Sequence, residues 1–111
     1  MNLNSSIKIK EGIILLTGKQ RSYLKSLAHD LEPIFQIGKH GLSENFVKQV
    51  EEALETRELI KIKILQNSVL EPKETAIELA ERANGEFVQS IGSKFVLYKE
   101  SEENKTIELP E

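Results

Sequence analysis

The sequence has no cysteine and no tryptophan, and only three of its 111 residues are proline. Without cysteine there can be no disulfide and no thiolate metal site, which fits a reducing cytoplasm. Aromatic residues make up 5% of the chain, too few for base stacking of the kind found in RRM domains. No apolar run approaches the ~20 residues of a membrane helix, and the run at residues 13–16 is too short for a signal peptide. We therefore expect a cytoplasmic protein with no membrane segment.

The composition that is present fits one ordinary globular domain, with 39% hydrophobic and 30% charged residues. The net charge is −3, but it is unevenly distributed. Between Thr17 and Gly41 basic side chains outnumber acidic ones, whereas glutamates dominate from Glu44 onward. These glutamates are either solvated helix faces or surfaces that attract a basic partner, and the sequence leaves both readings open.

Caps and hydrophobic spacing predict three helices and four strands. Thr17 and Gln20 form a capping box, Ser43 caps a second helix, and Pro72 opens a third. The expected elements are a helix after Thr17 that Pro33 ends, a strand at 33–37, a helix after Ser43, a strand at 59–65, a helix from Pro72 to about Ala83, and strands at 87–91 and 94–99. This α-β-α-β-α-β-β order predicts a compact layered α/β domain with a mixed four-stranded sheet. Gly92-Ser93 favours a type II′ hairpin between the last two strands.

The two ends of the chain carry weaker signals. From about residue 101 we expect a loose acidic tail, although Ile107 and Leu109 alternate as in an edge strand. Residues 1–14 form an N-terminal extension before a domain at 15–111. Lys10-Glu11-Gly12 fits a purine-rich coding stretch that resembles a ribosome-binding site, so a true start at Leu15 is one hypothesis. A genuine disordered arm or short edge strand is the other.

The most informative segment is the loop Gly38-Lys39-His40-Gly41, placed between an expected strand and a capped helix. Glycines allow the backbone to approach a ligand closely. The amides of a helix N-terminus are unpaired and lie at the positive end of its dipole, so they favour an anion. Lys39 adds a full charge, and a similar Gly-x-x-Gly loop clamps nucleotides in KH domains. The loop therefore predicts a site for the phosphates of RNA.

Further basic residues are candidates to extend this site. We expect Lys19, Arg21 and Lys25 on the first helix to flank the loop. Lys61 and Lys63 share one face of a strand, and Lys94 begins the last strand, so these three could widen the basic surface. The ordinary reading of each is a solvated lysine.

Other chemistries find no support in the sequence. Lys39 is followed by His40, and Pro33 stands where a nucleotide-binding P-loop needs its first glycine. His29 and His40 are the only histidines, and without cysteine they make a metal site unexpected. No Ser/His/Asp grouping stands out. We expect no catalytic residues, no cofactor and no metal, and hence no enzyme.

With these segments placed, the chain resembles the YhbY/CRM family of small RNA-binding proteins over residues 16–110. Matching blocks occur in order at residues 16–21 (LTGKQR), 24–29 (LKSLAH), 37–42 (IGKHGL), 58–63 (ELIKIK), 88–93 (VQSIGS), 96–99 (VLYK) and 107–110 (IELP). His40 departs from the pattern, because the family often has a smaller or amide side chain there.

The resemblance implies a fold similar to the C-terminal domain of translation initiation factor three. It implies RNA binding through the Gly-x-x-Gly loop and association with precursors of the large (50S) ribosomal subunit during assembly. We accordingly expect a monomer that binds ribosomal RNA and neither DNA nor membrane. The alternative is an adaptor whose acidic helices dock a basic ribosomal protein or assembly factor.

Overall fold

The computed structural model describes residues 16–66 and 68–111. It contains α1 (Gly18–Ala28), β2 (Phe35–Ile37), α2 (Glu44–Arg57), β3 (Leu59–Ile64), α3 (Pro72–Arg82), β4 (Glu86–Ile91) and β5 (Lys94–Tyr98). This is the predicted order of elements, and the predicted α/β class is confirmed. The hypotheses about residues 1–14 lie outside the described residues. No helix in the described part of the chain has the length and apolar character needed to cross a membrane.

The four strands form one mixed sheet in the order β2-β3-β5-β4. β2 runs parallel to β3, and the other neighbouring pairs are antiparallel. Gly92 adopts φ +59°, as the first central residue of a II′ turn requires, and Ile91 pairs with Lys94 across it. One irregularity interrupts the hairpin, since a β-bulge lies between Phe87 and Gln89.

Local sequence explains where the helices begin. The Thr17 hydroxyl accepts from the Gln20 amide while the Gln20 side chain accepts from the Thr17 amide. The Ser43 hydroxyl accepts from the Phe46 amide. At α3, Pro72 occupies the first turn and Glu71 is the cap, with its carboxylate accepting from two amides of that turn.

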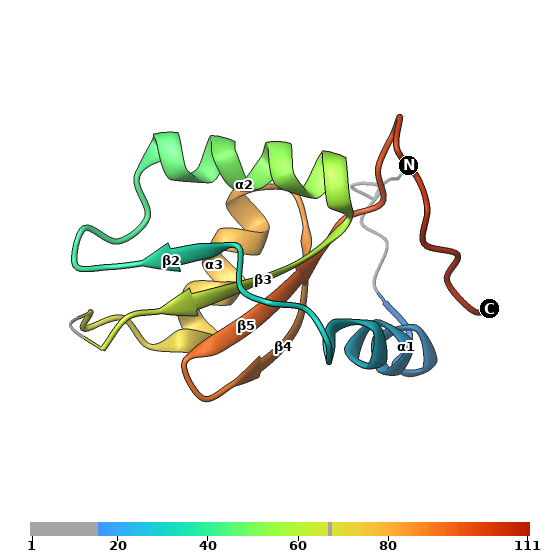
Figure 1. Ribbon diagram of the computed structural model, residues 1–111, viewed down its shortest axis with the longest axis horizontal. Coiled ribbons are helices and arrows are strands. Elements are labelled where there is room, and N and C mark those ends of the chain that lie inside the picture. Colours follow the sequence, from blue (N-terminus) through green and yellow to red (C-terminus); the bar gives the residue numbers. More distant parts are fainter. Residues whose placement is uncertain (1–15, 67) are drawn as a thin grey trace, which may run out of the picture.

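The helices divide between the two faces of the sheet (Figure 1). α2 and α3 cover one face, where the larger core includes Ile60, Ile62 and Phe95. α1 covers the other face together with the C-terminal segment, over a smaller core that includes Leu24 and Tyr98. Among the apolar residues of α1, Leu24 and Ala28 are buried, but Tyr23 and Leu27 remain more than a third exposed.

Residues 101–111, expected to be a loose tail, lie against the end of α2 and the α1 side of the sheet. They form no strand, but Ile107 and Leu109 pack on the smaller core. The carboxylate of Glu58, which is fully buried, accepts from the amides of Ser101, Thr106 and Ile107 at 2.8–2.9 Å. Internal hydrogen bonds therefore hold a segment whose composition alone suggests disorder.

Candidate nucleic-acid interface

The Gly38–Gly41 loop leaves the end of β2 and lies on the surface, with Lys39 and His40 exposed. The Gly41 amide donates to the Gly38 carbonyl at 3.3 Å, which closes a tight turn. Gly41 has φ +68°, a conformation that a side chain would strain. Gly38 has no such φ, and a methyl group added there would make only an ordinary contact with Leu65. Glycine is thus required by the backbone at Gly41 but not at Gly38.

The remaining amides of the loop are available. Among residues 16–66 and 68–111, no protein oxygen accepts a hydrogen bond from the amide of Lys39, His40 or Leu42. The first amides of α2 follow at once, and Ser43 satisfies only that of Phe46. Exposed, unpaired amides at a helix N-terminus suit an anion. Glu44, in the first turn, is an opposing charge that a bound phosphate would meet.

Two cross-strand rows of side chains extend from the loop over the α1 side of the sheet. Pairing places Gln36, Lys63, Lys94 and Ile91 in one row across all four strands. The next row joins Lys61, Val96 and Gln89. At the usual strand spacing the first row is about 14 Å wide and the second about 10 Å.

The orientation of these rows follows from burial. Ile62 and Phe95 are buried under α2 and α3, so their neighbours along each strand, including Lys63 and Lys94, point to the α1 side. Leu65 continues the same alternation and lies beside Gly38. The loop and the lysines Lys61, Lys63 and Lys94 thus share one end of one sheet face.

The other predicted basic residues lie elsewhere. α1 is at the end of the sheet away from the loop (Figure 1), so Lys19 and Lys25, which are exposed, do not flank it. Arg21 also has an internal role. Its Nη1 donates to the carbonyls of Phe87 and Val88 at the bulge of β4, at 3.0 Å for Val88.

Sequence reasoning missed three residues at this end of the molecule. Arg82, in the last turn of α3, donates from Nη1 to the Leu42 carbonyl at 3.3 Å and so brings a cation beside the loop. Gln36 and Gln89 belong to the rows described above. The position of Gln89 could have been found by counting back from the Gly92-Ser93 turn. Arginine is common in the last turn of a helix, where it interacts favourably with the helix dipole. The sequence therefore gives no sign that Arg82 contacts the loop.

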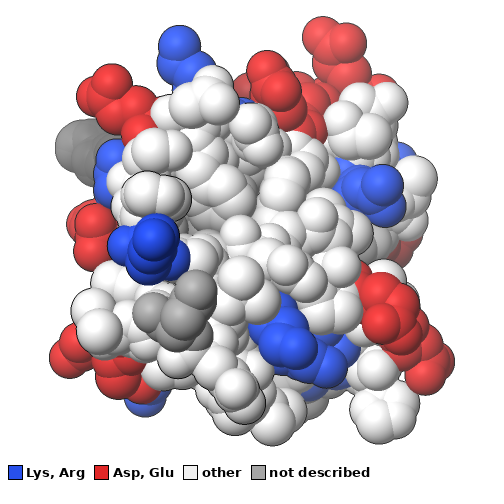
Figure 2. All heavy atoms as spheres, turned by 60° about the vertical axis from the view of Figure 1, so that its left-hand side comes forward, with Lys and Arg blue, Asp and Glu red and all other residues white. Residues whose placement is uncertain are grey.

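The loop end of the molecule is mostly uncharged on its surface. Figure 2 shows Lys and Arg there in separate spots, with Asp and Glu gathered toward the rim. On this face the positive charge is therefore local, and the acidic side chains that the view shows lie toward the rim.

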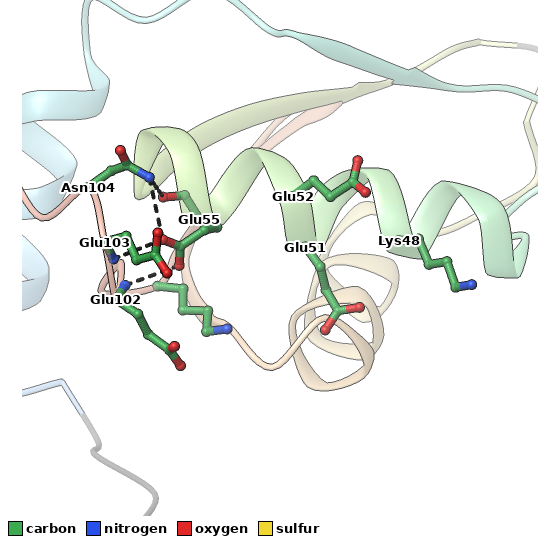
Figure 3. A pocket seen from close by; sticks show the side chains of 8 residues that line it. Lys48, Glu51, Glu52, Glu55, Glu102, Glu103 and Asn104 are labelled. Carbon is green, nitrogen blue, oxygen red and sulfur yellow. Dashed lines mark hydrogen bonds between the residues drawn. The ribbon is translucent and has the colours of Figure 1, made fainter.

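An acidic groove of about 510 Å³ runs along α2 to its C-terminal end (Figure 3). Its carboxylates include Glu51, Glu52 and Glu55, and Lys48 and Lys99 also line it. Glu55 turns to the C-terminal segment, where it accepts from the Ser101 hydroxyl at 2.7 Å and from two amides. The Ser101 hydrogen bond, with those amides, lowers the pKa of Glu55 to about 2. This carboxylate is engaged within the molecule.

Glu58 and Tyr98 lie beneath the same segment. Burial alone would raise the pKa of Glu58, but the amides of Ser101, Thr106 and Ile107 outweigh it, and the pKa lies below its usual value. Burial, together with nearby glutamates, raises the pKa of Tyr98 to about 12. The Tyr98 hydroxyl has no partner among the described residues.

No group of three or more His, Cys, Asp or Glu residues in the described ranges is placed to hold a metal ion. Neither His29 nor His40 hydrogen-bonds to a carboxylate or hydroxyl in the part of the chain that the structure describes.

Comparison with known proteins matches residues 16–99 to the family model described as the CRS1 / YhbY (CRM) domain. A Bacillus subtilis protein named "Probable RNA-binding protein YqeI" is 53% identical over 96 residues, covering 86% of this chain and all of the relative. A Haemophilus influenzae protein named "RNA-binding protein" is 41% identical, covering 86% and 95%. The solution structure of SAV1595 from Staphylococcus aureus has a TM-score of 0.73 and 57% identity, covering 86% of this chain and all of that one.

Proposed function

This chain belongs to the CRS1/YhbY (CRM) domain family, and from that premise we propose that it is a non-catalytic RNA-binding protein. The observation that carries the proposal is the exposed Gly38–Gly41 loop, whose amides at Lys39, His40 and Leu42 are unpaired within the described residues. These amides bind the phosphates of RNA, with Lys39 as the charge at the tip. Relatives named as RNA-binding proteins support this choice of ligand.

The lysines on the sheet extend the contact. Lys61, Lys63 and Lys94 follow the loop along one face, so a strand of RNA gripped at the loop continues over them. Few cations are involved, and we expect moderate affinity that falls steeply with salt. Repulsion from the acidic surfaces limits binding to other RNA. Within this proposal the natural ligand is ribosomal RNA in precursors of the large subunit, bound by a monomer in the cytoplasm.

The test replaces the loop charge without touching the core. Lys39→Asp with His40→Asp places two carboxylates where phosphate would bind, and both positions are exposed. We expect binding to deproteinised large-subunit ribosomal RNA, followed by fluorescence anisotropy, to be nearly abolished. Circular dichroism and the urea midpoint should be unchanged. A folded variant that binds this RNA as well as the unaltered protein would overturn the proposal.

A matched control separates RNA binding from the alternative adaptor function. Glu51→Lys with Glu52→Lys reverses two charges in the acidic groove at the other end of α2. If the chain binds RNA through the loop, this control retains RNA binding. If it docks a basic protein through its glutamates, the control instead loses co-sedimentation with large-subunit precursors in a sucrose gradient, while the loop variant keeps it.

A further inference from the structure

The α1 side of the sheet is only half covered. The same strands are buried to their ends on the α2 and α3 side, where Ile64 and Phe95 are almost inaccessible. On the α1 side burial stops at Val96, which is 2% exposed, and in the next row Ile91 is 67% exposed. The open part of this face contains Lys63 and Lys94, directly opposite each other in the register. Like charges in that arrangement oppose folding, so the sheet alone gives no reason for them.

A small hollow lies at the edge of the covered region. It measures about 120 Å³ and is lined by Lys61, Gln89, Ile91, Lys94 and Val96. This is well below the roughly 300–1,000 Å³ of sites for cofactors and drug-sized ligands, and suits a single planar ring. Val96 and Ile91 are apolar, Gln89 carries a donor and an acceptor, and the two lysines are cations. A nucleobase with phosphates on either side matches this set of groups.

The hairpin register brings Gln89 into this hollow, because it pairs Ile91 with Lys94 and Gln89 with Val96, and a bulge lies directly before Gln89. Adjacent residues of a regular strand point to opposite faces, yet Val88 belongs to the core under α1 and Gln89 lines the hollow on that same side. The bulge between Phe87 and Gln89 accounts for this, since Val88 is the extra residue and so lies on the same side of the sheet as Gln89. Arg21 donates to the carbonyls of Phe87 and Val88 and so holds the bulge in place.

We infer that this hollow is a subsite for one unstacked base of single-stranded RNA, and that Gln89 reads the edge of the base. The inference rests on the proposed RNA-binding function and deepens it. Ile91 and Val96 contact the ring, and Lys61 and Lys94 bind the phosphates next to it. Arg21 is a positioning residue that acts through the bulge. A base can enter only if it is unstacked, so the preferred ligand is a loop or a single strand rather than a duplex.

The test uses the full chain and fluorescent single-stranded RNAs of A, C or U, each about ten nucleotides long, together with a hairpin duplex. We expect the unaltered protein to prefer single strands to the duplex and to rank the three homopolymers. Gln89→Met keeps the length of the side chain but removes both hydrogen-bonding groups. This variant should bind the best homopolymer several-fold more weakly and bring all three affinities to within about twofold, with an unchanged salt dependence.

Gln36→Met is the matched control, because Gln36 lies on the same face of edge strand β2 but does not line the hollow. It should keep the ranking. In nuclear magnetic resonance spectra, the side-chain amide signals of Gln89 should shift on titration with the preferred homopolymer.

The possible failures are distinguishable. The base subsite is overturned if Gln89→Met keeps the ranking, if the unaltered protein does not rank the homopolymers, or if the duplex binds as tightly as single strands. In those cases RNA binding through the loop still stands. If the unaltered protein fails to bind large-subunit ribosomal RNA as well, or the loop variant binds that RNA normally, the proposed function itself fails.

Discussion

The two ends of helix α2 differ in whether the backbone amides beside them are hydrogen-bonded. At its N-terminal end the amides of Lys39, His40 and Leu42 have no acceptor among the described residues. At its C-terminal end Glu58 is buried and collects the amides of Ser101, Thr106 and Ile107. The first end is open to a ligand, and the second is closed by the molecule's own chain. A charged residue is therefore not by itself the sign of a binding site in this protein. The buried Glu58 carboxylate, whose hydrogen bonds are satisfied within the molecule, belongs to the fold.

The closed end should respond most strongly to substitution. Glu58→Gln retains the shape of the side chain but weakens charge-assisted hydrogen bonds from three amides, so we expect the free energy of unfolding to fall by about 3 kcal/mol. Urea denaturation measures it, with Glu52→Gln on the exposed side of the same helix as the control. RNA affinity measured where the variant is folded should not change. A urea midpoint equal to that of the unaltered protein would show that the segment is not held by Glu58.

The C-terminal end of α2 should also make the free energy of unfolding depend on pH in the acidic range. The pKa of Glu55 is about 2 in the folded protein, against an ordinary value of 4.5, and that of Glu58 is also lowered. Their contribution is therefore complete above pH 4.5 and is lost as the pH falls from 4.5 toward 2, because the unfolded chain takes up these protons first. Thermal unfolding across this range should show the loss. In Glu55→Gln the stability should fall less steeply with pH than in the unaltered protein. An identical slope would contradict the lowered pKa of Glu55.

At the open end, the two loop glycines should behave differently. Gly41→Ala forces a side chain into φ +68° and should lower the free energy of unfolding by about 1 kcal/mol. Gly38→Ala should leave stability unchanged, since the added methyl group only touches Leu65. If RNA approaches the backbone closely at this point, Gly38→Ala should still weaken binding. Equal stability losses in the two variants would mean that the loop backbone differs from this structure.

The smallest effect is expected where two lysines face each other. Lys94→Gln removes the like-charge pair with Lys63 and should stabilise the sheet by about 0.5 kcal/mol. It should also weaken RNA binding and reduce the slope of log affinity against log salt by about one. Lys73→Gln, on the exposed surface of α3, changes the net charge equally and serves as the control. An unchanged RNA affinity in Lys94→Gln would show that the sheet lysines are not part of the RNA interface.

The sequence predicts those parts of the fold that depend on neighbours along the chain. Thr17 and Ser43 form their expected caps, and Gly92 takes the φ of the expected turn. The loop before α2 was found from its glycines and the cap that follows. Long-range contacts were not predictable in this way. Glu58 looks like an ordinary last residue of a helix, and only the folded chain shows that it binds a segment 43–49 residues away.

The residues of the candidate site also fall into two groups, those that local sequence patterns predict and those that depend on long-range contacts. Lys61 and Lys63 share one face by strand alternation, which can be read from the sequence. Lys94 lies opposite Lys63 through the pairing of β3 with β5, two strands that are not neighbours along the chain, and local sequence does not predict that pairing. Arg21 was expected at the loop, yet its guanidinium holds the bulge of β4. A bulge has no reliable sequence pattern, because it depends on how two strands fit against α1. The position of Gln89 opposite Val96, by contrast, follows from counting back from the Gly92-Ser93 turn.

The most direct test compares the two ends of α2 in one experiment. Amide signals of the ¹⁵N-labelled protein are followed by nuclear magnetic resonance while single-stranded ribosomal RNA fragments are added. We predict that the signals of Lys39, His40 and Leu42 shift or broaden, whereas those of Ser101, Thr106 and Ile107, already bound to Glu58, stay in place. Shifts confined to the acidic end, with a silent loop, would contradict the account.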